Sequence, residues 1–188
     1  FGHIPTEERL RIIHGWSKNK YLLHCKELHL LIIRNNNINN RRLHLMNLSD
    51  TQLCNLCKQE VDDNLHRFVN CHQVSHIWRQ LEVVLADIGL NRLIDGKLIF
   101  CSDSDESPNS ITNTLISYTR YYTNATYFLG EPPTRDFYLF RLKNLACSFR
   151  EAYRVLDISI RDKLIWAKLY FFLHSSDPDS DLNATIAP

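Results

Sequence analysis

Apolar side chains recur along most of this chain at intervals of three and four residues, which places them on one face of a helix. Between the periodic stretches lie polar segments with few turn residues, since the 188 residues include only 5 glycines and 6 prolines. This pattern favours helices over a sheet with many turns. It predicts helices over residues 6–16, 20–33, 66–88, 109–129, 134–156 and 158–174. The expected fold class is therefore all-α, a helical bundle.

The helix expected over residues 134–156 has the most explicit division into two faces. Its inward residues are expected to be Phe137, Phe140, Leu145 and Phe149. Its outward residues are expected to be the cations Arg135, Arg141, Lys143, Arg150 and Arg154.

The polar segments divide the chain into four expected parts. Residues 1–49 form a basic helical arm, in which the asparagine-rich segment 34–42 is expected to be a loop or a frayed helix end. Residues 50–92 hold a group of cysteines and histidines with the helix that follows it, and residues 93–176 form a C-terminal helical bundle. The last part, residues 177–188, is expected to be a flexible acidic tail.

Charge is unevenly distributed, although the formal net charge is only +1. Residues 1–49 contain eight Lys and Arg against three Asp and Glu. A basic front and an acidic tail are compatible with binding of a polyanion through the front. They are equally compatible with two ordinary solvated faces.

The most specific chemical pattern is formed by Cys54, Cys57, His66 and Cys71, with the spacing C-x2-C-x8-H-x4-C. Zinc in structural sites takes four thiolate or imidazole ligands in a tetrahedron. Four protein ligands leave no open position for water, so the pattern predicts one structural, non-catalytic Zn²⁺. The alternatives are three buried cysteines with an unrelated histidine, or a shifted set in which His72 or His76 takes part.

The remaining cysteines, Cys25, Cys101 and Cys147, stand alone in apolar surroundings. This is not the regular framework of a small secreted protein, and a reducing compartment is expected. No apolar run is long enough to span a membrane, and no signal peptide is evident. The sequence starts at Phe1 without an initiator methionine, which suggests a piece of a longer polypeptide. We therefore expect an intracellular protein, cytoplasmic and nuclear.

Several of these residues resemble a known family. Cys54-x2-Cys57, His66-x-Phe68, Cys71 and Ile77-Trp78 are similar to the zinc-binding region C-terminal to the reverse transcriptase of non-LTR (LINE-type) retrotransposons. Arg41-Arg42-Leu43 before the cysteines and Ile165-Trp166-Ala167-Lys168 near the end add to the resemblance. It implies a CCHC zinc knuckle with Trp78 as a packing residue, and a module that holds template RNA or target DNA during target-primed reverse transcription. The chain lacks polymerase motifs, so the partner implied is a reverse transcriptase domain in the same polypeptide.

A nucleic-acid-binding module needs cations for phosphate groups. The candidates are Arg34, Arg41 and Arg42, which flank the asparagine-rich loop, together with Lys58 and Arg67 in the zinc-binding segment. The expected function is thus non-catalytic binding of RNA or DNA, with no membrane partner.

Two other functions stay open on the sequence alone. A helical protein-interaction module stabilised by zinc would need no nucleic acid. A nuclease-associated domain would need metal-binding carboxylates, for which Asp87 and the sequence Asp95-Gly96-Lys97 are the only candidates. Binding of labelled RNA or DNA that depends on salt concentration would distinguish a nucleic-acid-binding module from a protein-interaction module.

Overall fold

A computed structural model describes residues 23–101, 110–152 and 160–175, and within these ranges the protein is helical. The helices are α2 (Leu23–Ile33), α3 (Asn40–Leu45), the π-helix η1 (His66–Asn70), α4 (His72–Asp87), α5 (Gly96–Cys101), α6 (Ile111–Leu129), α7 (Arg135–Ala152) and α8 (Ile160–Ser175). No strand occurs in the described ranges, where the only extended pairing is an isolated antiparallel bridge between Leu53 and Val61. The predicted all-α class is confirmed.

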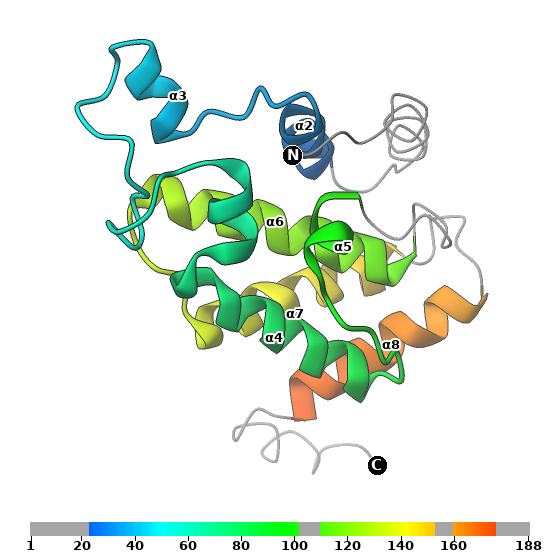
Figure 1. The fold of residues 1–188 in the computed structure, drawn as a ribbon. Helices are drawn as coiled ribbons and strands as arrows, with labels where there is room; N and C mark the ends of the chain where they lie inside the picture. The colour runs from blue at the N-terminus through cyan, green and yellow to red at the C-terminus, as the bar shows by residue number, and fades with distance from the viewer. Residues whose placement is uncertain (1–22, 102–109, 153–159, 176–188) are drawn as a thin grey trace, which may run out of the picture.

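Helix α6 lies at the centre of the arrangement and packs against α2, α4, α5, α8 and η1 (Figure 1). Every residue from Ile111 to Arg120 is buried. The helix begins where the Ser110 hydroxyl accepts a hydrogen bond from the Asn113 backbone N–H. It ends at Gly130, whose φ of 72° is a left-handed conformation that glycine adopts without steric cost.

Apolar residues from the three expected parts 1–49, 50–92 and 93–176 meet in one continuous core. Leu28 and Ile32 of α2, Trp78 of α4 and Trp166 of α8 belong to the same buried cluster. Segments 1–49, 50–92 and 93–176 therefore all contribute residues to one core.

The expected faces of α7 are partly wrong. Leu145 and Phe149 are buried as predicted, but Phe137 and Phe140 are 52% and 53% exposed. The buried stripe begins one residue later, with Tyr138, which is followed at helical spacing by Leu142. The segment 137–140 is apolar or aromatic at every position and so offers two possible apolar faces. Packing against α6 and α8 selects the face that contains Tyr138.

The helix expected over residues 66–88 is interrupted. The π-helix ends at Asn70, the next residue Cys71 is extended with φ and ψ of −65° and 118°, and α4 starts at His72. The asparagine-rich segment is a loop only as far as Asn39, because α3 begins at Asn40.

The first expected helix and the acidic tail lie outside the described residues, as do Arg154 and the side chain of Arg150. Among the helices that the structure describes, none is long and apolar enough to cross a membrane.

Candidate metal centre and an adjoining basic pocket

Cys54, Cys57, His66 and Cys71 come together as the sequence predicts. Their ligand atoms lie within 4.8 Å of one another, and all four residues are buried. The Sγ atoms of Cys54 and Cys71 are 4.0 Å apart, and Sγ of Cys57 is 3.3 Å from Nε2 of His66. The cluster can hold a metal ion, with Nε2 as the histidine atom that faces the other ligands.

The first two ligands are presented by a tight turn closed by backbone hydrogen bonds. The Lys58 N–H donates to the Cys54 carbonyl at 2.9 Å, and Lys58 adopts a left-handed φ of 57° to make the turn. Backbone N–H groups of Leu56 and Cys57 also donate to the Cys54 sulfur. Such hydrogen bonds hold a thiolate ligand in place and partly offset its charge.

The other two ligands are presented by the π-helix. The Cys71 N–H donates to the His66 carbonyl at 2.8 Å, five residues earlier, and closes the wide turn. The added residue in this turn brings Cys71 toward His66, and the extended backbone at Cys71 lets α4 start afresh. The Gln73 N–H then donates to the Cys71 sulfur. Interruption of the predicted helix is thus what completes the ligand set.

The electrostatics of the cluster favour a cation. The hydrogen bond from the Cys71 thiol lowers the pKa of Cys54 to about 5, whereas the same hydrogen bond and burial raise the pKa of Cys71. One sulfur therefore ionises readily, and the second resists a like charge 4.0 Å away. A metal ion removes this conflict, because it allows all the thiols to bind as thiolates.

The alternative histidines do not join the cluster. His72 is exposed, and its Nε2 lies 3.0 Å from the Gln73 side-chain amide. His76 lies next to helix α7, where its Nε2 is 2.9 Å from the Pro133 carbonyl oxygen.

Comparison with protein-family models, with curated proteins and with solved structures gave no match for this chain.

A buried ion pair joins the loop that carries Cys54 and Cys57, here named the metal-binding loop, to the central helix α6. Asp62 and Arg67 are both fully buried, and Nη2 of Arg67 donates to Asp62 at 2.7 Å. The Asp62 carboxylate also accepts hydrogen bonds from the Asn40 backbone N–H at 2.6 Å and from the Tyr127 hydroxyl. The Arg67 guanidinium lies 3.5 Å from the centre of the Tyr127 ring and donates to Asn124 at 3.2 Å. These contacts attach the metal-binding loop to α6, next to the metal-ligand candidate His66.

Arg67, a candidate for phosphate binding on the sequence alone, is buried. Its side chain is 0% exposed, so it offers no donor to a phosphate group. No signal in a single sequence marks the pairing, because Asp62 is one of two adjacent acids and Tyr127 lies 60 residues beyond Arg67.

Two asparagines attach the asparagine-rich segment to the metal-binding loop. The Asn40 side-chain amide donates to the Leu53 carbonyl at 2.7 Å and to Asn55 Oδ1 at 2.8 Å. The Asn37 amide donates to Asn64 Oδ1 at 3.1 Å. Asn37 and Asn40 are buried, so these asparagines position the segment and are not available to a ligand.

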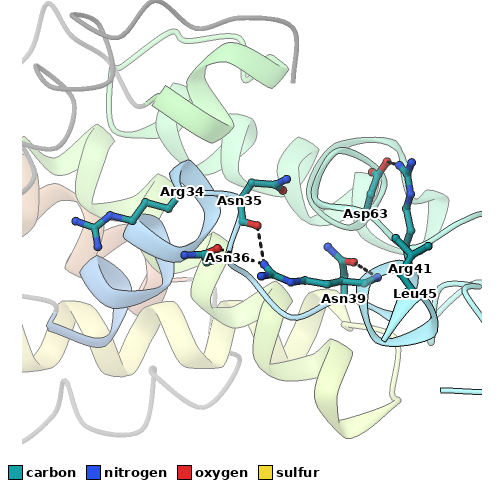
Figure 2. A pocket seen from close by; sticks show the side chains of 8 residues that line it. Arg34, Asn35, Asn36, Asn39, Arg41, Leu45 and Asp63 are labelled. Carbon is teal, nitrogen blue, oxygen red and sulfur yellow. Dashed lines mark hydrogen bonds and ion pairs between the residues drawn. The ribbon is translucent and has the colours of Figure 1, made fainter. Parts of the chain in front are cut away.

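Arg34, Arg41 and Arg42 line one pocket of about 560 Å³ at the edge of this attachment (Figure 2). Its other lining residues are Asn35, Asn36, Asn39, Leu45 and Asp63. The three arginines are exposed. Figure 2 shows Arg34 and Arg41 at opposite ends of the pocket. The structure thus brings together the three arginines that the sequence singled out beside the asparagine-rich loop.

Two of these arginines are held by neighbouring groups. Nη1 of Arg42 donates to the Asn35 carbonyl at 2.9 Å and to Asn36 Oδ1 at 3.3 Å. Nη1 of Arg41 lies 3.8 Å from an Asp63 carboxylate oxygen, in an ion pair whose members are 57% and 41% exposed. Such an exposed pair contributes little stability and yields readily to another anion.

Three further candidates, Lys58, Asp95 and Asp87, lie outside the pocket. Lys58 is exposed but does not line the pocket. Asp95 accepts a hydrogen bond from the Leu98 N–H at 2.8 Å, so its carboxylate caps the first turn of α5. Asp87, the other acid considered for a nuclease, is an exposed residue at the end of α4.

Proposed function

We propose that this protein is a non-catalytic nucleic-acid-binding module whose basic pocket is built on a structural zinc site. The observation that carries the proposal is the pocket lined by Arg34, Arg41 and Arg42. Its three arginines are exposed, and the segment that bears them is hydrogen-bonded to the metal-binding loop.

Zinc suits the ligand set better than other common metals. Tetrahedral zinc with bonds of about 2.3 Å to sulfur places two sulfurs about 3.8 Å apart. The Cys54–Cys71 separation of 4.0 Å is close to this value. Three thiolates and one imidazole fill the shell, so the ion stabilises the fold and leaves no open position for catalysis.

The pocket suits a chain of phosphates better than one isolated phosphate. Its arginines are distributed from one end to the other, and arginine pairs well with phosphate oxygens. The lining contains no aromatic residue on which a base could stack. We therefore assign the pocket to the sugar-phosphate backbone of RNA or DNA.

The resemblance to the region C-terminal to a non-LTR retrotransposon reverse transcriptase supplies a biological context for this proposal. In that context the module would work beside a reverse transcriptase domain of the same polypeptide, in the cytoplasm and the nucleus. It would hold template RNA or target DNA while the polymerase extends a nicked end.

Replacing Arg34, Arg41 and Arg42 together with glutamine should weaken nucleic-acid binding and reduce its dependence on salt. Each phosphate contact with duplex DNA contributes about 0.9 to the slope of log K against log salt concentration. We expect the slope to fall by about 2 to 3 in the triple variant, measured by fluorescence anisotropy with a labelled duplex and a labelled RNA.

The matched control replaces Arg79, Arg135 and Arg161 with glutamine, since these exposed arginines lie on α4, α7 and α8 away from the pocket. It removes the same formal charge and should change the slope much less. Equal losses in the two triple variants would contradict the pocket. A slope near zero in the unaltered protein would contradict nucleic-acid binding itself and favour the protein-interaction module.

A further inference from the structure

A cysteine and a histidine face each other between α7 and α8, far along the chain from the metal-binding residues. Sγ of Cys147 lies 3.8 Å from Nε2 of His174, which is in the last turn of α8. Both residues are half-buried. The Phe149 and Trp166 rings stack with their centres 4.0 Å apart and fix the two helices against each other.

The histidine is oriented so that a ring nitrogen can accept the thiol proton. Nδ1 of His174 is 2.8 Å from the Tyr170 carbonyl oxygen, which can only accept a hydrogen bond. Nδ1 therefore carries the hydrogen, and in the neutral ring Nε2 presents its lone pair to the sulfur. The His174 ring also stacks on the Tyr170 ring, with the ring centres 3.9 Å apart, and this contact fixes the orientation of the imidazole.

We propose that Cys147 is a covalent modification site for small soft electrophiles, with His174 as the base that activates its thiol. The proton moves from Sγ to Nε2 of His174, and the sulfur attacks the electrophilic carbon. With an alkyl halide the C–S bond forms, the carbon–halogen bond breaks and the halide leaves with the electron pair. The imidazolium then releases its proton to water. A nucleophile beside a base that is itself held by a third group is the arrangement that activates thiols in proteins.

The other cysteines with described side chains are less accessible than Cys147, although Cys57 also lies beside a histidine. Cys25 is buried, and burial raises the pKa of its thiol to about 12. Cys54, Cys57 and Cys71 are buried in the metal cluster. We therefore expect Cys147 to be modified selectively among them.

The test uses the full, zinc-loaded chain with limiting iodoacetamide at neutral pH, and peptide mass spectrometry to follow each cysteine separately, Cys101 included. Cys147 should react faster in the folded chain than in the same chain unfolded in urea. This comparison needs no variant. Partial burial alone would slow the reaction, so a faster rate reports activation. Equal or slower labelling of Cys147 in the folded chain would overturn the proposal.

Two variants assign the activation to the histidine. His174→Asn keeps a donor near the Tyr170 carbonyl, and His174→Phe keeps the stacked ring, but neither retains Nε2. Both should lower the Cys147 labelling rate by about tenfold or more. Zinc content and thermal unfolding confirm that the variants fold. Unchanged labelling in a folded variant would overturn the role of His174.

Discussion

Stripping the metal from the purified protein with a high-affinity chelator should abolish its cooperative thermal unfolding. The free energy of zinc binding to a structural site is roughly 10 kcal/mol or more, which is comparable to the whole stability of a domain. The cluster residues Cys54 and Cys71 belong to the continuous core, so loss of the ion disturbs packing beyond the loop. Circular dichroism against temperature, with and without chelator, measures the effect.

The experiment has two internal controls. One equivalent of zinc should restore the transition, whereas magnesium should not, because magnesium prefers oxygen ligands. The Cys147→Ser variant should respond to the chelator like the unaltered protein, because Cys147 lies outside the cluster. An unchanged transition in the metal-free protein would show that packing alone holds the loop.

Replacing Arg67 with methionine should destabilise the protein by about 3–5 kcal/mol, because it leaves a buried carboxylate without its counter-charge. Arg67 donates to Asp62 through two nitrogens, at 3.2 and 2.7 Å, and neither side chain reaches solvent. The measurement is the free energy of unfolding in urea. Arg79→Met on the exposed face of α4 is the matched control and should change stability by about 0.5 kcal/mol or less.

A double variant distinguishes the missing counter-charge from lost packing. Adding Asp62→Asn to Arg67→Met removes the stranded charge and keeps a polar group beside Tyr127 and Asn40. Stability should recover in part, so the two changes together should cost less than the sum of the single ones. A loss below about 1 kcal/mol for Arg67→Met, or an additive double variant, would contradict the importance of this ion pair.

The metal ligands could be predicted from the sequence because their spacing encodes local geometry. Cys54 and Cys57 need only one tight turn, and His66 and Cys71 need only adjacent helical turns. The sequence did not reveal that Cys71 follows a π-helix, because its apolar periodicity continues into α4. The short-range spacing was enough to identify the ligands. The π-helix could not be predicted, because it forms where the Cys71 sulfur has to face the other ligands.

The environment of Arg67 could not be predicted, because it depends on contacts between distant segments. Arg67 is polar and stands beside a ligand, which favours an exposed position when the sequence is considered alone. Its burial requires Asp62, Tyr127 and Asn124 to be placed around it by the packing of α6. The same limit applies to Phe137, whose exposure was decided by which face of α7 meets the core.

The grouping of Arg34, Arg41 and Arg42 was anticipated because these residues are close in sequence and flank one loop. The attachment of this segment to the metal-binding loop could not be predicted, since it depends on amide hydrogen bonds from Asn37 and Asn40 to residues 13 to 27 positions away. An asparagine-rich segment predicts a loop but does not indicate which surface its amides will contact.

We propose a closed zinc site that uses Cys54, Cys57, His66 and Cys71. Elemental analysis of zinc per chain in the unaltered protein, in Cys71→Ser and in Cys147→Ser tests this site. We expect one zinc per chain in the unaltered protein and in Cys147→Ser, and a large loss of zinc in Cys71→Ser. A protein purified without zinc that takes up none on addition, or full zinc retention in Cys71→Ser, would disprove the site.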